Sequence, residues 1–377
     1  MRFAMLVLCL MPLLEASAHT PSVAQPADTV AWMRPGDKHK PSIGIWMLRR
    51  VGDFLRAFND VDTSYIEPQR YNFTVMMQST TTYEMYRLGD TNGQSVTLAP
   101  EFNYRIGPYL GYRWVFLGYT VDISHMHLSS GNKQRKEYDF SLYSALFGID
   151  FYYRKTGNDY KIRDVRLAND MNTSAMKGIP FGGLTSSIKG FNAYYIFNHH
   201  RFSYPAAFSQ STVQRRSAGS WLAGLGYTNH TLLMDWQSLN SMMEKKLGET
   251  IFDNVLDSTL QSGKVKYTDM SLSVGYAYNW VFAHNWLLAS SLSVALAYNQ
   301  SQGQLRHKFI NFKDFSSKNV NLDGIGRFGL VYNNSRWYAG LSAIFHAYNY
   351  RRANFSTNNI FGNINLYVGF NFGRRKH

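Results

Sequence analysis

The amino-acid sequence predicts an all-β fold, a transmembrane antiparallel β-barrel of about 12 strands, with roughly 10 to 14 also possible. Two observations in the 377-residue chain lead to this prediction. Short segments with alternating apolar and polar residues recur from Tyr71 to Phe372, which indicates strands with different environments on their two faces. The connections between these segments are alternately short and long, as at the two rims of an outer-membrane barrel. We therefore assign residues 71–372 to the barrel.

Residues 1–18 are expected to form a secretory signal peptide. Arg2 supplies the positive charge, Phe3 to Leu14 the apolar stretch, and Ala16-Ser17-Ala18 the small-residue cleavage site. The apolar stretch is too short for a membrane-spanning helix. The only cysteine, Cys9, lies within this signal, so the mature chain is expected to contain no disulfide.

Residues 19–70 are expected to form a periplasmic leader that contains a short amphipathic helix. Between Ile43 and Phe58, apolar residues recur at helical spacing, with charged residues elsewhere around the turn. Such a helix could cap the periplasmic mouth, lie on the inner leaflet, or pack inside the barrel. Capping or plugging is the preferred interpretation.

The first half of the barrel region combines short turns with two long connections. The first strand is expected to end before a loop from Thr80 to Ser95, and a polar excursion runs from Lys155 to Ser187. Short turns are expected near Trp114 to Phe116, near Ser144 to Leu146, and at Asn198 to His200. The expected strands carry outward apolar residues at Tyr71 to Met77, Leu98 to Tyr112, Leu117 to Ile123, Phe140 to Leu142, Phe147 to Phe151 and Phe191 to Phe197.

The second half repeats the pattern, with turns at Ala283-His284-Asn285 and Asn333-Asn334-Ser335 and a long loop through Val265. An even strand number would place both termini in the periplasm. The stretch from Arg201 to Ser217 could be a long strand, a strand with a lid, or an inserted plug. The expected strands are Trp221 to Tyr227, Met270 to Trp280, Trp286 to Tyr298, Val320 to Tyr332, Trp337 to Tyr348 and Ile360 to Phe372.

The alternation also predicts which side chains enter the barrel interior, because residues of opposite parity point to opposite faces of a strand. Charged groups of this interior face could pair across the lumen and fill it, or could line a polar passage. The candidate lumen-lining residues are Glu101, Arg105, Asp122, Asp150, Arg154, Asp269, Asp323, Arg327 and His346.

The formal net charge of +14 suggests anionic partners, and in an exported barrel these are lipid headgroups rather than nucleic acid. Basic residues of the expected outward loops could bind phosphates of lipopolysaccharide, or could simply be solvated. The candidate lipopolysaccharide contacts are Lys133, Arg135, Lys136, Arg306, Lys308, Arg351 and Arg352, with further loop cations at Lys161, Arg163 and Arg166.

The last strand has an aromatic finish at Phe370 and Phe372, similar to the C-terminal signal by which the barrel assembly machinery recognises outer-membrane proteins. It departs from that signal by continuing into a basic tail, residues 373–377.

No established catalytic motif is found in the sequence. His125 and His127 lack a third ligand or an orienting partner in sequence reach, and His199, His200 and Ser203 fall in an expected solvated turn. The sequence has no Gly-x-Ser-x-Gly elbow, His-Glu-x-x-His pair or phosphate-binding Gly-Lys-Ser/Thr loop. We therefore predict no catalytic, cofactor-binding or metal-binding set.

Several segments resemble a family of exported proteins from Bacteroidetes-type bacteria, the domain of unknown function numbered 4421. The most distinctive is Arg201-Phe202-Ser203-Tyr204-Pro205-Ala206-Ala207-Phe208. The others are Asp62 to Pro68 with Tyr71 to Phe73, Leu110 to Trp114, Phe151 to Arg154, and Arg216 to Ser220. The resemblance implies an outer-membrane barrel without an assigned activity.

Three functions remain open from the sequence. The leading hypothesis is a non-enzymatic channel, transport or envelope-structural protein of the bacterial outer membrane. One alternative is a lipid- or lipopolysaccharide-modifying enzyme with its site at the outer rim or in the lumen. Another is a surface adhesin that acts through its long loops.

Overall fold

The structure is a computed structural model that describes residues 61–90, 93–112, 115–118, 121–122, 136–156, 159–167, 172–247, 264–301, 319–352 and 355–374. The chain divides into two units, Met1–Val51 and Gly52–His377, and the described residues all belong to the second. The expected signal peptide, the expected helix at residues 43–58, and the pair His125 and His127 lie outside the described residues.

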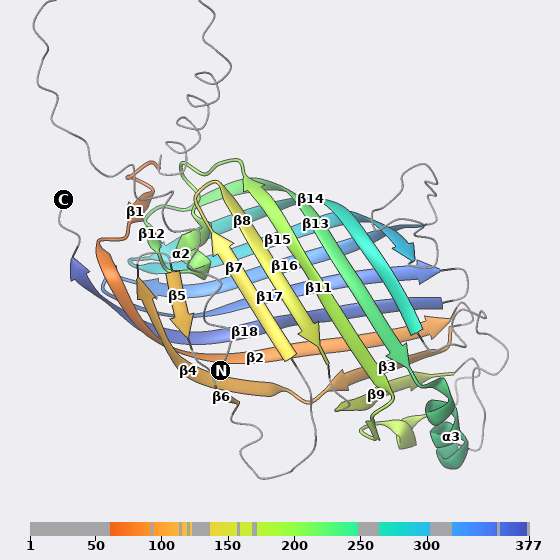
Figure 1. Ribbon diagram of the computed structural model, residues 1–377. Coiled ribbons are helices and arrows are strands. Elements are labelled where there is room, and N and C mark those ends of the chain that lie inside the picture. Colours follow the sequence, from red (N-terminus) through yellow and green to blue (C-terminus); the bar gives the residue numbers. More distant parts are fainter. Residues whose placement is uncertain are drawn as a thin grey trace, which may run out of the picture. The chain divides into compact units, whose positions relative to one another are not determined.

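Most described residues form one antiparallel sheet of 16 strands, which Figure 1 shows side by side in a curved arrangement. Its order is β10-β9-β3-β2-β18-β17-β16-β15-β14-β13-β11-β8-β7, with β4 paired to β2 and with β5 and β6 paired to β4. The strands are β2 (Tyr71–Asp90), β3 (Ser95–Pro100), β4 (Asn103–Tyr112), β5 (Val115–Gly118), β6 (Val121–Asp122), β7 (Lys136–Tyr143), β8 (Phe147–Lys155), β9 (Tyr160–Arg166), β10 (Pro180–Phe181), β11 (Leu184–Ile196), β13 (Ala218–Met234), β14 (Lys264–Ala283), β15 (Trp286–Ser301), β16 (Val320–Asn333), β17 (Trp337–Arg352) and β18 (Phe355–Arg374).

This arrangement agrees with the predicted number of strands. Both β3 and β4 pair with β2, and both β5 and β6 pair with β4, so each pair occupies one position in the wall. With β9 and β10 taken as an extension beside β3, the described strands form about 12 wall segments, the number expected for the barrel.

The sheet curls toward closure, but its hydrogen-bond ladder is open within the described residues. The strand path ends at β7 on one side, and β4 with β5 and β6 forms the other side. Arg105 of β4 nonetheless forms an ion pair with Glu137 of β7, with 3.4 Å between Nη2 and Oε2. The two sides of this seam are therefore within side-chain reach of each other.

Short turns join strands at one end of the sheet, as the sequence predicts, but the separation of short and long connections is incomplete. The long connection between β11 and β13 lies at the short-turn end, and at the other end β17 stops at Arg352 and β18 begins at Phe355. At the short-turn end, β7 ends at Tyr143 and β8 begins at Phe147, β14 ends at Ala283 and β15 begins at Trp286, and β16 ends at Asn333 and β17 begins at Trp337. Asn285 and Ser335 in two of these turns have positive φ angles, 65° and 73°. Asparagine and serine are common turn residues because their side chains hydrogen-bond the nearby backbone.

The remaining elements lie in the connections. They are the two-stranded sheet of β1 (Ile66–Pro68) and β12 (Thr212–Gln214), the helices α2 (Tyr204–Phe208) and α3 (Trp236–Leu247), and the 3-10 helix η3 (Ser174–Met176). Among the described residues, no helix combines the length and apolar character needed to cross a membrane.

Exposed apolar side chains form a belt around the outward face of the sheet. They alternate with buried polar residues, so that Leu272 is 67% exposed whereas Ser293 and Asn279 are buried. We call this surface the apolar belt, and its larger members include Phe73, Val75, Met77, Tyr104, Ile106, Leu110, Phe140, Phe151, Phe191, Trp221, Leu225, Met270, Leu272, Val274, Tyr276, Trp280, Leu288, Leu292, Leu296, Leu322, Phe328, Trp337, Leu341, Leu366 and Val368.

At the long-connection end the polarity of the two faces is reversed. On β13, Asn229 and Thr231 follow Tyr227 on the outward face, with the exposed Leu233 after them, whereas Leu232 and Met234 are buried on the inward face. On β2, Leu88 is buried inside and Arg87 is exposed outside. An apolar inside and a polar outside are typical of a sheet surrounded by water.

The buried apolar residues of this end form one cluster, which we call the distal core. It draws on the wall, on β9 and β10, and on both η3 and α3. Its members include Tyr86, Leu88, Val96, Leu98, Tyr160, Ile162, Val165, Met176, Phe181, Leu184, Ile188, Leu232, Met234, Leu239 and Met243.

Two predictions are wrong toward this end of the sheet. The expected loop at Thr80 to Ser95 is strand as far as Asp90, where Tyr83 and Met85 keep the phase of Phe73 while Tyr86 and Leu88 are buried on the inward face. Tyr298 was expected to be exposed with Leu296 but is 7% exposed, although Met270 and Val320, directly opposite it in the ladders, are exposed.

Gly362 on β18 is required by the close approach of β17. A Cβ atom there would lie 2.0 Å from the carbonyl oxygen of Ile344. We expect Gly362→Ala to lower the free energy of unfolding by about 1–3 kcal/mol, since relief of this contact requires a backbone shift. Urea unfolding in detergent micelles measures the effect. The control is Gly326→Ala on β16, where the nearest atom to a Cβ is 3.6 Å away, and equal losses in both variants would contradict the prediction.

Candidate functional site inside the sheet

The short-turn end of the interior is occupied by the connection between β11 and β13, residues 197–217, which we call the inner plug. Helix α2 begins after Ser203, whose hydroxyl accepts a hydrogen bond from the Ala206 amide, and Pro205 lies in its first turn, where no backbone donor is needed. Tyr204, Ala206 and Ala207 are buried against wall residues. Of the alternatives for Arg201 to Ser217, the structure therefore selects the inserted plug.

Polar contacts fix the inner plug to the wall. Asn279 of β14 donates to the Ser203 carbonyl at 2.8 Å, and the Tyr204 hydroxyl is hydrogen-bonded to Ser291 of β15. Gln210 donates to the Tyr367 hydroxyl of β18 at 2.7 Å. The plug thus contacts well-separated positions around the sheet.

The segment before the barrel also holds the plug. β1 pairs with β12, and Arg215 forms an ion pair with Glu67. Asp62 accepts hydrogen bonds from the backbone and hydroxyl of Ser64, which lower the pKa of its carboxyl. Residues 61–68 and the plug therefore form one assembly at this end.

A buried ion pair crosses the interior next to the plug. Arg327 of β16, 1% exposed, donates from Nη2 to Oδ2 of Asp150 on β8. The two strands are separated in the sheet by β11, β13, β14 and β15, so the pair joins opposite walls. The guanidinium carbon lies 4.8 Å from the ring centre of Tyr194 and 5.9 Å from that of Tyr204, which places it over aromatic faces of the wall and the plug.

A second buried arginine, Arg154 on β8, extends toward β18. Arg154 donates from Nη2 to Asp139 of β7 at 2.7 Å and lies 3.4 Å from the Gly362 carbonyl oxygen. Its guanidinium carbon is 4.7 Å from the ring centre of Phe361, on which His346 stacks at 5.0 Å. This arginine therefore connects the seam strand β7 with the far wall.

Toward the distal core, aromatic and acidic side chains fill the interior of the sheet. The Tyr152 hydroxyl is 2.6 Å from that of Tyr348 and 2.7 Å from that of Thr228. Nε2 of His230 lies 3.3 Å from Oδ2 of Asp269, and the Asp323 carboxylate accepts a hydrogen bond from the backbone N–H of Asn349 at 2.9 Å. All these side chains except Asn349 are buried, so a substrate would need a structural change to reach the His230 imidazole.

The nine predicted lumen residues divide into four groups. Asp150, Arg154, Asp269, Asp323, Arg327 and His346 are buried inside the sheet, and Arg105 is partly exposed at the seam. Glu101 differs from expectation: it is exposed between β3 and β4, where it pairs with Lys161 of β9. The side chain of Asp122 lies outside the described residues.

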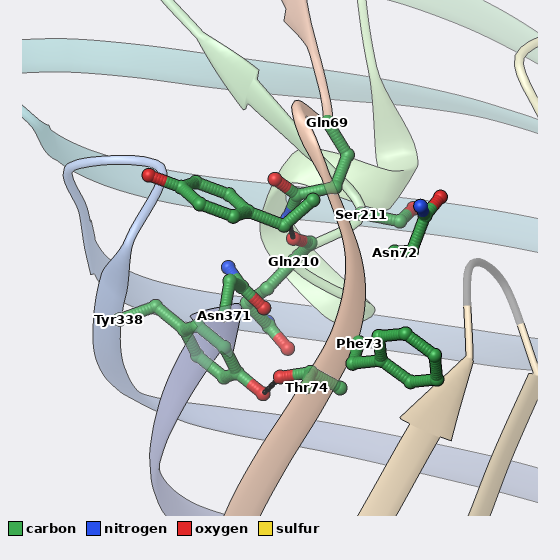
Figure 2. Close-up of a pocket in the computed structure, with 9 residues that line it drawn as sticks. Gln69, Asn72, Phe73, Thr74, Gln210, Ser211, Tyr338 and Asn371 are labelled. Atoms are coloured by element: carbon green, nitrogen blue, oxygen red, sulfur yellow. Dashed lines mark hydrogen bonds between the residues drawn. The ribbon is translucent and has the colours of Figure 1, made fainter. Parts of the chain in front are cut away.

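A small pocket opens at the short-turn end, where β2 meets the plug (Figure 2). Its roughly 250 Å³ of empty space includes open solvent. Most of its lining residues carry a hydroxyl or an amide group, and a hydrogen bond of 2.8 Å joins Thr74 to Tyr338. The lining residues are Gln69, Tyr71, Asn72, Phe73, Thr74, Gln210, Ser211, Tyr338 and Asn371.

The cluster at His199, His200 and Ser203, predicted to be solvated, is only partly so. His200 is exposed as expected, whereas His199 is 8% exposed, with 4.1 Å between the two ring centres, and Ser203 is buried and caps α2. The burial of Ser203 follows from the insertion of the plug. Within the described ranges, no group of three or more His, Cys, Asp or Glu residues could hold a metal ion.

Among the predicted lipopolysaccharide contacts, Lys136 and Arg351 are exposed on β7 and β17. Lys133, Arg135, Arg306, Lys308 and the side chain of Arg352 lie outside the described residues.

Several interior residues were missed by the sequence analysis. Glu137 and Asp139 on β7 share the parity opposite to Phe140, a signal that was available from the alternation. His230 likewise has the parity opposite to Tyr227 on β13, whereas Tyr204 has no such signal, since it belongs to the plug.

A family model described as "Domain of unknown function (DUF4421)" matches residues 60–372 of this chain. No curated protein matches it. Solved structures of low similarity match this chain, and three of them serve as examples. They are the outer membrane protease OmpT from Escherichia coli (6% identity, 82% of this chain and 100% of that chain covered, TM-score 0.33), the toluene transporter TodX from P. putida (10%, 81% and 91%, 0.21), and the translocator domain of the autotransporter NalP from Neisseria meningitidis (7%, 87% and 96%, 0.30).

Proposed function

This chain belongs to the family described as Domain of unknown function (DUF4421), and from that premise we propose that it is a sealed, non-enzymatic β-barrel with a structural role in the bacterial outer membrane. In this proposal the apolar belt faces lipid, the distal core lies outside the membrane, and the inner plug closes the periplasmic mouth.

The apolar belt supports the membrane location. It continues over neighbouring strands, for example through Leu225, Leu272 and Leu296, which are directly opposite one another in the ladders. Water-soluble proteins rarely expose contiguous apolar surface of this extent, whereas barrel walls in lipid do.

The observation that carries the sealed state is the Asp150–Arg327 pair seated against the plug residue Tyr204. Burial of an arginine is costly unless its charge is paired, so this contact favours a permanently filled interior over a water-filled passage. The Tyr152–Tyr348 contact and the distal core fill the levels beyond it.

Planar-bilayer recordings of the refolded protein test this function. We expect no stable single-channel conductance, because side chains from opposite walls meet in the interior. An open porin reconstituted in the same lipid is the positive control. Regular conductance steps from the intact protein would overturn the sealed state and restore the channel hypothesis.

A deletion strain separates the structural role from lipid modification. Under the proposal, the outer membrane becomes more permeable to detergent while the mass spectrum of its lipid A is unchanged. A loss or gain of acyl chains or phosphates would instead favour an enzyme.

A further inference from the structure

Four aromatic rings form a continuous row on the outward face near the end of the apolar belt. Phe140, Phe151, Phe191 and Tyr227 lie directly opposite one another across β7, β8, β11 and β13. Successive ring centres are 6.4, 6.0 and 6.2 Å apart. Such rows occur where a barrel wall crosses from hydrocarbon into the headgroup layer.

Three lysines follow this row on the same face, toward the long-connection end. Lys189 is directly opposite Tyr153, one step beyond the aromatic row, and Lys136 is directly opposite Lys155 one step further. The rings of Tyr138 and Tyr153 lie on the level of Lys189, between the aromatic row and the pair of Lys136 and Lys155, with 6.0 Å between their centres. We call Lys136, Lys155 and Lys189 the lysine triad.

The pairing of Lys136 with Lys155 places two positive charges on adjacent strands, with Cβ atoms about 5 Å apart, an arrangement that is destabilising by itself. The acids of β7 do not relieve it: Glu137 and Asp139 point inward, where they pair with Arg105 and Arg154. In the described part of the chain, no ion pair with a carboxylate is formed by any of the three lysines.

We propose that the lysine triad binds a phosphate group of a glycolipid of the lipid A type in the outer leaflet. The inference rests on the proposed membrane location and adds a specific ligand to it. The aromatic row would pack against the sugar and the first part of the acyl chains, and the ammonium groups would pair with the phosphate directly above. The anion compensates the repulsion between Lys136 and Lys155, which the chain alone leaves in place.

A triple variant tests the site: Lys136→Gln, Lys155→Gln and Lys189→Gln together. The matched control, Lys177→Gln, Lys245→Gln and Lys246→Gln, removes the same charge from exposed positions near η3 and on α3. Native mass spectrometry of the full-length mature protein in detergent measures binding of bisphosphorylated lipid A, of the same lipid without phosphates, and of phosphatidylglycerol.

We expect the affinity for bisphosphorylated lipid A to fall about fivefold per lysine, on the order of 100-fold in the triple variant, and to stay unchanged in the control. Equal affinities in the two variants would overturn the site, as would equal binding of phosphatidylglycerol and lipid A by the unmodified protein. A folded protein that binds none of the lipids would instead refute the membrane location on which the proposal depends.

Discussion

Replacement of Arg327 by leucine is expected to lower the free energy of unfolding by about 3–5 kcal/mol. The change leaves the Asp150 carboxylate inside the sheet without its cationic partner, and it removes the guanidinium that contacts Tyr194 and Tyr204. An uncompensated buried charge accounts for most of this loss. Urea unfolding of the refolded protein in detergent micelles, followed by tryptophan fluorescence, measures the effect.

The double variant Arg327→Leu with Asp150→Leu separates charge from packing. With both ionised groups gone, we expect most of the lost stability to return, because apolar replacements of a buried ion pair are often neutral. Arg351→Leu, at an exposed outward position, serves as the control for loss of an arginine. A single variant as stable as this control would mean that the interior around Asp150 is hydrated and that the barrel is not sealed.

The second large effect is expected for Tyr204→Ala in the inner plug, a loss of about 3–5 kcal/mol. The ring is fully buried, stacks on Tyr143 with 6.0 Å between ring centres, and carries a hydroxyl that is hydrogen-bonded to Ser291. Its removal leaves a cavity between α2 and three wall strands that the neighbouring backbone cannot close. The same unfolding experiment measures it.

Tyr204→Phe distinguishes the ring from the hydroxyl. This variant keeps the packing and loses only the contact with Ser291, so we expect a loss of about 0.5–1.5 kcal/mol. If alanine and phenylalanine at this position have equal effects, the ring does not pack in the interior, and the plug does not close the short-turn end.

The sequence predicted those parts of the fold in which one face of a strand is apolar and the other polar. On β14 and β15 every predicted outward residue from Met270 to Trp280, and from Trp286 to Leu296, is exposed. The turns at Ser144 to Leu146 and Ala283 to Asn285 are where they were expected. At the first of them the outward residues change parity, which indicates a reversal of the chain.

The alternation rule failed where the strands do not have one apolar and one polar face. Beyond Gln78 on β2 the apolar residues lie on both faces, Tyr83 and Met85 in the phase of Phe73 and Tyr86 and Leu88 inward, so no single apolar face marks this part of the strand in the sequence. Glu101 was assigned to the interior by parity, but β3 and β4 are separated at this point, and the side chain turns outward to Lys161.

The sequence by itself determined an antiparallel wall with an apolar exterior, since residue spacing along one strand is enough to specify two faces. It also placed six charged or ionisable residues on the face that is buried: Asp150, Arg154, Asp269, Asp323, Arg327 and His346. Only the tertiary structure decided which of them meet and whether the space between them is filled. Asp150 and Arg327 are 177 residues apart, and their contact depends on the curvature of the whole sheet and on a plug whose position no local pattern encodes.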